Sequence, residues 1–545
     1  MFVIVFRGYR AMATAAPSFS AADPTPAHAA GWAASLQDLL ALLGRHFARS
    51  EARAHLGAYL TGLLSPIERK NGWHLAEQAG DATPYALQHL LGRSRWDADA
   101  VRDDLQAYVR ASLADPAGVL VIDETSFLKK GSHSVGVGVQ YSGVTGKLEN
   151  CQVGVFLAYV GPRGQALYDR ALYLPRAWAD DPARRAQAWV PRAVGFATKP
   201  QLAQGMVLRA LDSALPVAWV AGDEVYGGDY PLRAALEARR QPYAMAVKST
   251  HAPWAGVRQR PARDLVAAAP AGVWARLSCG DGSKGPRLYD WLRLPINHAF
   301  GARWQRWLVA RRSLTAPEDP RSTAYFLAFA PAATSLATLA GVIGERWGRA
   351  PGGAGRGAFE EAKGEVGLDH YEVRSWHGWH RHVTLALWAH AFLAVTRADS
   401  REPLPLAAGE EKKGGRHRGA RRPSAAGVAA GLPERARGAP APLGDAPPAA
   451  AHPRPPVGLV PLAAPPPGHR PVPPLQAARR RARARRVSTT VVLGQYLRLA
   501  GDLQAGRLGD QPSITYDRYI AHPTARRCCG SRSPRATSPA TVGSG

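Results

Sequence analysis

The large apolar side chains stop abruptly along this chain, and that boundary limits how much of it can fold. All 15 Trp lie at or before Trp388, and the last of the 12 Phe is Phe392. Residues 401–480 hold 18 of the 45 Pro, and residues 401–545 contain no Trp or Phe. Such a segment cannot bury enough apolar surface to offset its conformational entropy. We therefore predict a disordered Pro/Arg-rich tail over 398–545.

The chain carries a strong excess of positive charge. Its 69 Lys and Arg against 42 Asp and Glu give a net charge of +27 and a pI near 10.5. An excess of this size predicts an anionic partner, and nucleic acid is the usual one. Six of the eight residues from Arg479 to Arg486 are Arg. That cluster is either a nucleic-acid-binding arm or a solvated tail without function, and the first 400 residues still hold +11.

Cysteine usage and hydropathy exclude several classes of protein. Only 4 Cys occur, and none forms a C-x2-C pair, which excludes a disulfide framework and a zinc site built on Cys. No run of 18 apolar residues is present, so the sequence predicts no membrane span. The apolar start, Met1–Phe6, is too short for a signal sequence. We expect a soluble, cytoplasmic protein.

The first hundred residues indicate helices. We predict disorder over 1–30 and a helical domain over 31–115. Ser65 to Glu68 has the pattern of a capping box, and Thr83-Pro84 and Asp97 are typical of two further helix starts. The helices either hold a DNA-reading helix or form a plain packing domain. The basic residues that would support the first reading are Arg69, Lys70, Arg93 and Arg95.

From residue 116 to 397 the pattern changes to strands alternating with helices. Four apolar runs predict buried strands, at 119–122, 153–160, 217–221 and 243–247. Helices between the later strands favour a mixed α/β sheet. Residues 255–330 are a predicted β-rich insertion, and a long helix resumes over 376–395. On that helix Trp376, Trp379 and His382 are interpreted as a core stripe rather than a DNA contact.

Two carboxylates follow buried strands in matched contexts. Asp123 follows the first strand in VLVIDETSFLKKG, and Asp223 follows the third of those runs in VAWVAGDEVYGG. If these strands are neighbours, both acids converge at one edge of the sheet and repel unless a cation lies between them. Carboxylate oxygens are ligands that suit Mg2+ or Mn2+, and a cation held in this way supports phosphoryl transfer. The alternative for each Asp is a plain strand-end turn, and Lys129 and Lys130 are either phosphate contacts or solvated.

Several stretches, in order, resemble bacterial insertion-sequence transposases of the DDE superfamily. They include LLSPIERKNGWHLAE, VIDETSFLKKG, QYSGVTGKLENCQVGVFLAYV, GFATKPQLA, WVAGDEVYG and AKGEVGLDHYEVRSWHGWHRHVTLALWAHAFL. The resemblance covers about residues 35–397. It implies an RNase H-like catalytic domain over 116–397, a DNA-binding helical region before it, and a β-rich insertion. It also implies that Asp123 and Asp223 are the first two metal-binding acids.

The third acid is where this sequence departs from the resemblance. The family has a Glu four positions after an Arg and seven before a Lys, on one helix. Lys363 and Arg346 match that Lys and that Arg, and they are expected to contact DNA phosphate. Arg356 stands seven before Lys363, and GRAPGGAGRGA is predicted to break the helix. Glu361, with Glu360 as its alternative, is the candidate for the vacant role.

The resemblance implies Mg2+-dependent cleavage at insertion-sequence ends and strand transfer to target DNA, with a homodimer on DNA. The alternative is a catalytically inactive, DNA-binding transposase remnant. A third hypothesis is an RNase H-like nuclease that acts without transposition. Selective binding to terminal inverted repeats distinguishes the first two hypotheses from the third. The segment 348–358 separates the first two, because the enzyme needs a Glu-bearing helix there.

Overall fold

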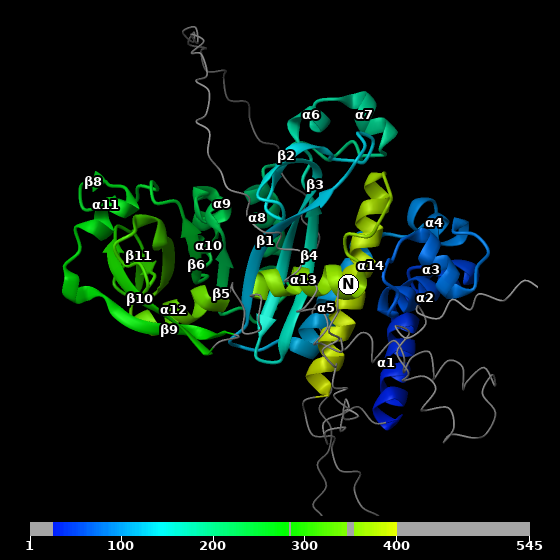
Figure 1. Cartoon of the computed structure of the whole chain (residues 1–545), viewed down its shortest axis with the longest axis horizontal. Coiled ribbons are helices and arrows are strands. Elements are labelled where there is room, and N and C mark those ends of the chain that lie inside the picture. The colour runs from blue at the N-terminus through cyan, green and yellow to red at the C-terminus, as the bar shows by residue number, and fades with distance from the viewer. Residues whose placement is uncertain (1–25, 283–284, 346–353, 401–545) are drawn as a thin grey trace, which may run out of the picture. The chain divides into compact units, whose positions relative to one another are not determined.

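The structure is a computed structural model that describes residues 26–282, 285–345 and 354–400 (Figure 1). The predictions for residues 1–25, for Arg346 and for the tail beyond residue 400 lie outside the described residues. Within the described ranges, no helix combines the length and the apolar character that crossing a membrane requires.

Five helices of the described segment precede the first strand. They are α1 Pro26–Gly44, α2 Ser50–Leu64, α3 Gly72–Ala79, α4 Tyr85–Gly92 and α5 Ala98–Leu113. The carboxylate of Asp97 accepts a hydrogen bond from the backbone N–H of Asp99 at the start of α5. Val101, Leu105 and Val109 are buried, as their four-residue spacing predicts. The helix starts near residue 84 and at Asp97 are therefore confirmed.

The predicted capping box at Ser65 is wrong, because Ser65 ends a helix instead of beginning one. Its hydroxyl donates to the carbonyl of Gly62 at 2.7 Å, at the C-terminus of α2. The next helix, α3, is capped by Asn71, which accepts from the backbone N–H of His74. Lys70 is buried between them and donates to the carbonyls of Leu63 and Ser65. This lysine satisfies carbonyls that the end of α2 leaves unpaired.

Ten strands form one mixed sheet, in the order β2-β3-β1-β5-β6-β12-β11-β10-β9 with β4 also paired to β3. β1 is parallel to β5, and β5 to β6, whereas β1 and β4 are antiparallel to β3. This α/β arrangement confirms the RNase H-like fold. The strands are β1 Val119–Leu128, β2 Gly138–Ser142, β3 Lys147–Gly161, β4 Gly164–Leu172, β5 Trp219–Gly222, β6 Tyr243–Val247, β9 Ala275–Gly282, β10 Gly285–Ile296, β11 Trp304–Arg312 and β12 Thr323–Pro331.

The β-rich segment after residue 255 continues the main sheet. β12 pairs with β6, so β9 to β12 extend the sheet beyond its last parallel strand. Helix α12 (Leu336–Glu345) packs on these strands and closes a second apolar core around Trp291 and Trp307. A separate two-stranded sheet joins β7 (Trp254–Ala255) to β8 (Arg258–Gln259).

The remaining helices lie between or against the strands. They are α6 Arg176–Ala179, α7 Pro182–Gln187, α8 Lys199–Asp212, α9 Glu224–Gly227, α10 Tyr230–Ala238, α11 Ala262–Ala267, α13 Ala354–Val366 and α14 Trp376–Asp399, with short 3-10 turns at Ala271–Val273 and Pro320–Ser322. Figure 1 shows α13 and α14 in front of the strands around β1 and β4. Contacts link α14 to β4, to α5 and to the N-terminal helices α2 and α4.

Helix α13 corrects part of the predicted break in the Gly-rich segment. It begins at Ala354 and continues through Gly355 and Gly357, while residues 346–353 lie outside the described residues. Its buried side chains are Ala358, Phe359, Ala362 and Val366. Packing of that face against the sheet outweighs the weak helix propensity of glycine.

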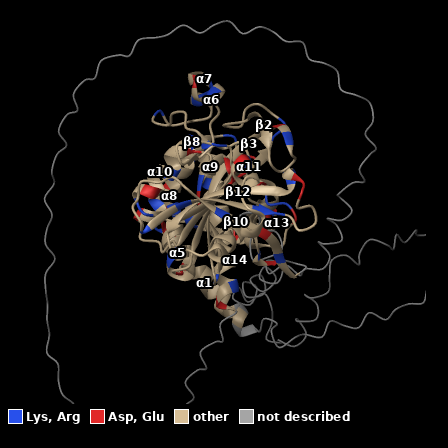
Figure 2. Cartoon of the chain, turned by 90° about the vertical axis from the view of Figure 1, so that its left-hand side faces the viewer, with Lys and Arg blue, Asp and Glu red and all other residues tan. Residues whose placement is uncertain are grey.

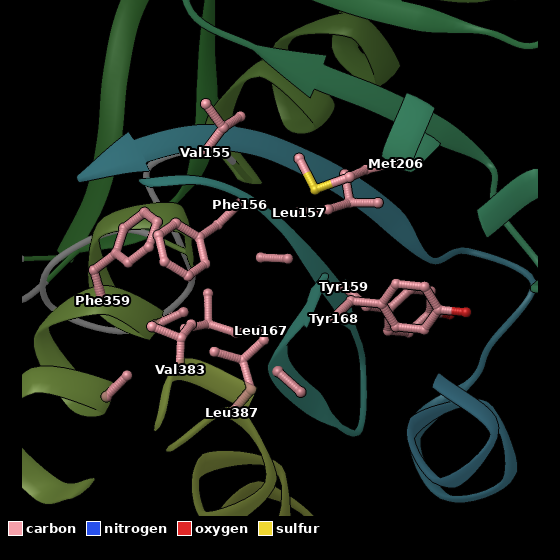
Figure 3. Close-up of a cluster of buried hydrophobic side chains, with 14 of the residues drawn as sticks. Val155, Phe156, Leu157, Tyr159, Leu167, Tyr168, Met206, Phe359, Val383 and Leu387 are labelled. Carbon is pink, nitrogen blue, oxygen red and sulfur yellow. The ribbon is translucent and has the colours of Figure 1, made fainter. Parts of the chain in front are cut away.

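The core forms on both faces of β3, as its continuous apolar run predicts. Phe156 packs against Phe359 of α13, with ring centroids 5.2 Å apart, and Leu157 lies beside Met206 of α8 (Figure 3). Alternate side chains therefore contact different helices, because successive residues of a strand face opposite sides. Trp379 and His382 of α14 are buried, which confirms their interpretation as core residues.

One buried carboxylate connects three elements on the sheet. Asp169 of β4 is fully buried, and it accepts hydrogen bonds from Gln106 of α5 at 3.1 Å and from Arg209 of α8 at 2.8 Å. By contrast, Asp212 is 65% exposed where it meets Arg239 at 3.4 Å. A buried ion pair that loses one partner leaves a charge without compensation, whereas an exposed pair contributes little.

We expect Asp169→Ala to lower the free energy of unfolding by about 3 kcal/mol. Asp212→Ala is the matched control and should lower it by about 0.5 kcal/mol or less. Urea denaturation followed by tryptophan fluorescence measures both. Equal losses in the two variants would contradict a structural role for the buried carboxylate.

Candidate active site

Strand register brings Asp123 and Asp223 to the same edge of the sheet. β1 and β5 are parallel neighbours, and Ile122 pairs with Gly222. Asp123 directly follows Ile122, and Asp223 directly follows Gly222. Both aspartates are half-buried. Asp223 also caps α9, since its carboxylate accepts from the backbone N–H of Val225 at 2.9 Å. β5 ends at Gly222 while β1 continues, so the carboxylates lie where the parallel pairing stops.

A third carboxylate adjoins this pair, and sequence reasoning missed its role. Glu124 accepts a hydrogen bond from the phenol of Tyr226 at 2.5 Å and one from the ammonium group of Lys199 at 2.6 Å. Tyr226 is fully buried, and its pKa is raised well above its usual value by burial and then by Glu124, Asp223 and Asp123. The phenol therefore stays protonated and donates its hydrogen bond to Glu124. Both residues stand beside the two aspartates in the sequence, but no spacing rule indicates this contact.

The predicted DNA-binding lysines differ in what they contact. Lys363 of α13 donates to the hydroxyl of Thr125 at 2.8 Å, two residues beyond Asp123 on β1. Lys129 lies 3.7 Å from the centre of the Tyr371 ring, and burial lowers its pKa to about 8. Lys130 is exposed. Of the three, Lys363 is nearest in register to the aspartates, and Lys130 is the most accessible.

Glu361 is not brought to the two aspartates. Its carboxylate accepts from Arg397 at 3.1 Å and from Gln165 at 3.3 Å, and it lies 3.6 Å from His390. Gln165 pairs with Val160, which pairs with Val119 at the start of β1. Asp123 is four residues further along, roughly 13 Å at the usual rise of a strand. Its ion pair therefore holds Glu361 near the opposite end of the strand.

Glu360 is exposed on the adjacent position of α13. Among the described residues, no group of three or more His, Cys, Asp and Glu side chains is placed to hold a metal ion. The two carboxylates Asp123 and Asp223 fit a hard divalent cation in the chemistry of their oxygen atoms. They stand at the positions where the resemblance implies the first two of three metal-binding acids.

The positive charges of the described part are dispersed. Figure 2 shows Lys and Arg interspersed with Asp and Glu over the helices and strands, without segregation to one element. Net charge alone therefore does not indicate which basic residues meet an anion. Burial and pairing of each side chain decide that question.

The fold and the aspartate pair define a class of α/β protein with an acidic edge suited to a divalent cation. Residues 42–271 match the family described as DDE superfamily endonuclease, and the match includes both aspartates. A probable transposase for insertion sequence element IS701 from Microchaete diplosiphon is 28% identical over 193 residues. That alignment covers 35% of this chain and 47% of the relative, so the chain spans about half of the relative's length. Over residues 42–271 the chain is therefore similar to the DDE superfamily endonucleases, and its resemblance to insertion-sequence transposases is confirmed.

The environment of Glu361 predicts how its loss affects the protein. Burial alone would raise its pKa, but His390 and Arg397 outweigh that effect and lower the pKa to about 2. A lowered pKa means that the ionised carboxylate stabilises the fold above its ordinary pKa. This stabilisation is lost as the pH falls toward 2.

We expect Glu361→Gln to lower the free energy of unfolding by about 2 kcal/mol at pH 7. The difference in free energy of unfolding between this variant and the parent chain should become smaller below pH ~4.5, where Glu361 in the unfolded chain is protonated. Urea denaturation at a series of pH values measures it, with Glu360→Gln as the neighbouring exposed control. A difference independent of pH would contradict the ion pair.

Proposed function

We propose that this chain is a transposase that cleaves DNA at insertion-sequence ends and transfers the freed strand by metal-dependent phosphoryl transfer. The observation that carries the proposal is the register of β1 and β5, in which Ile122 pairs with Gly222 and Asp123 and Asp223 come next. Two carboxylates at this edge are the ligands that Mg2+ or Mn2+ requires. The relative's printed name, a probable transposase, supports the same activity.

In this proposal, Asp123 and Asp223 would hold the divalent cation, and the chemistry that it would supply is activation of a water or 3′-hydroxyl and stabilisation of the leaving oxygen. Lys363, beside Thr125, lies against the scissile strand, and Arg346 and Lys130 contact neighbouring phosphates. The pair of Tyr226 and Lys199 holds Glu124 fixed next to Asp123. This fixed arrangement orients the acidic edge before DNA binds.

The domain organisation follows the same proposal. Residues 31–115 form the helical DNA-binding domain, and residues 116–397 form the catalytic domain with its insertion at about 255–330. The partners are the terminal inverted repeats and the target DNA. Because two ends must be held together during transposition, we propose a homodimer on DNA.

We expect the purified chain to cleave a labelled duplex that carries its element's end when Mg2+ or Mn2+ is present. Asp123→Asn should reduce the rate by about a hundredfold or more, because the amide retains the shape but not the charge that holds the cation. Denaturing gel electrophoresis of the labelled strand measures the rate. Asp264→Asn, at an exposed carboxylate of α11, is the control and should cleave at the parent rate.

Three outcomes would contradict the proposal. Cleavage that persists in Asp123→Asn would place the chemistry at another site. Specific binding of the end without cleavage, under both metals, would identify a DNA-binding remnant instead of an enzyme. Cleavage without preference for the end sequence would indicate a nuclease that does not transpose.

The position of the third acid generates a separate prediction. Position 356 lies on α13, seven residues before Lys363, where the resemblance implies a Glu. We expect Arg356→Glu to raise Mg2+-dependent cleavage by about tenfold or more, since a third carboxylate strengthens the hold on the cation. Arg356→Gln, which removes the positive charge without adding a ligand, is the control. Equal rates in the two variants would mean that position 356 does not supply the third acid.

A further inference from the structure

A cavity of about 790 Å³ lies between α4, the segment around α7 and the loop that follows β1. We call it the Trp189 pocket, and its main lining residues are Tyr85, Arg93, Arg184, Trp189 and Arg374. Among the described residues, three Arg and two His line it, and no Asp or Glu does. A concave surface with this composition fits an anion that also carries flat apolar faces.

Trp189 is held in a conformation that an aromatic residue seldom adopts. It directly follows α7 and its cap residue, with a φ of 58°. The N–H of Val190 donates to the carbonyl of Arg185, and the N–H of Trp189 to that of Ala186, as in a helix C-terminus that normally carries glycine at this position. The indole is nevertheless 53% exposed. Neither backbone preference nor burial accounts for tryptophan here.

The arginines of the pocket differ in how firmly they are held. The guanidinium of Arg184 lies 4.0 Å from the centre of the Trp178 ring and donates to the carbonyl of Ser132. Arg93 and Arg374 are exposed, and neither pairs with a carboxylate within the described part of the chain. The pocket therefore combines one oriented positive charge with two that have no acidic partner. These charges complement phosphate groups.

The pocket lies beyond the C-terminal end of β1, in the direction in which the strand runs from Asp123. β1 runs five residues from Asp123 to Leu128, roughly 17 Å at the usual strand rise. The chain then passes the exposed Lys130 to Ser132 and His133, which line the pocket. A polyanion that leaves the acidic edge along β1 would meet Lys130 before it reaches the arginines.

We propose that the Trp189 pocket binds unpaired nucleotides of a DNA strand that extends from the metal site. The phosphates contact Arg93, Arg184 and Arg374, and bases stack on Trp189 and on Tyr85, whose side chain is 70% exposed. Bases in a duplex have their faces covered by neighbouring pairs, whereas unpaired bases present them to aromatic side chains. This proposal rests on the proposed action on DNA, and it adds the strand type and the residues that hold it.

The test is the affinity of the full chain for a fluorescein-labelled oligodeoxythymidine of about 15 nucleotides in EDTA, measured by anisotropy. Trp189→Gly should weaken binding about tenfold, because a stacking face is lost. Its melting temperature should equal or exceed that of the parent, since glycine prefers this backbone conformation. Trp189→Phe should retain most of the parent's affinity for the oligonucleotide, because phenylalanine keeps an aromatic stacking face. A merely structural role of the indole would not predict this result.

Trp254→Ala is the matched control, because that indole is 54% exposed and lies outside the pocket. It should bind like the parent. Arg374→Ala should reduce the slope of log affinity against log salt by about 0.7, the loss of one phosphate contact to a single strand. The basic residues beyond 400 are common to all variants, so they do not affect these differences.

Unchanged affinity in Trp189→Gly would overturn the proposal, and so would equal competition by polyglutamate, which carries charge without bases. Either result would leave the metal-dependent cleavage of duplex ends untouched. If, conversely, Trp189→Gly loses single-strand binding while the parent chain fails to cleave duplex ends, that result would support the pocket and contradict the proposed enzyme. The two proposals can therefore fail separately.

Discussion

The pairing of β1 with two different neighbours is the constraint on which the rest of the structure depends. On one side β1 is antiparallel to β3 over its whole length, and on the other it is parallel to β5 for only four residues. Beyond the end of this short parallel partner, no other strand among the described residues pairs with β1 on that side. The carboxylates of Asp123 and Asp223 lie at that point, so the acidic edge is a direct result of unequal strand lengths.

The elements that sequence predicted well are those whose signal is local. The buried strands and the N-cap of α5 depend on residues close together in the chain. The placement of the two aspartates needed only the further assumption that two apolar strands are neighbours. The errors came from distant contacts. Lys70 pairs with the carbonyls that end α2, and packing on the sheet holds α13 together through its glycines. Tyr226 and Glu124 are 102 positions apart in the chain, and the periodicity of the sequence does not indicate that they are in contact.

The basic residues show that charge in the sequence and charge at a surface are separate properties. Lys129 and Lys70 belong to motifs that resemble DNA-binding proteins, yet burial lowers the pKa of each to about 8, and both donate to backbone carbonyls. They join segments that would otherwise leave carbonyl groups unpaired. Arg93 and Arg374, which no motif singled out together, are the exposed cations beside an aromatic pocket. Only the fold distinguishes the two groups.

Helix geometry explains why α13 can serve the acidic edge with some positions and not with others. Each residue turns the helix by about 100°, so position 361 points roughly 160° away from Lys363, whereas positions 356 and 360 lie within roughly 60° of it. Lys363 contacts Thr125 on the strand that carries Asp123, and Glu361 accordingly turns toward Arg397 and His390 of α14. The angle between Glu361 and Lys363 on the helix therefore explains both why Glu361 pairs with α14 and why it does not reach the acidic edge. A third acid on this helix must therefore come from the face of Lys363, which favours position 356 or Glu360 over Glu361.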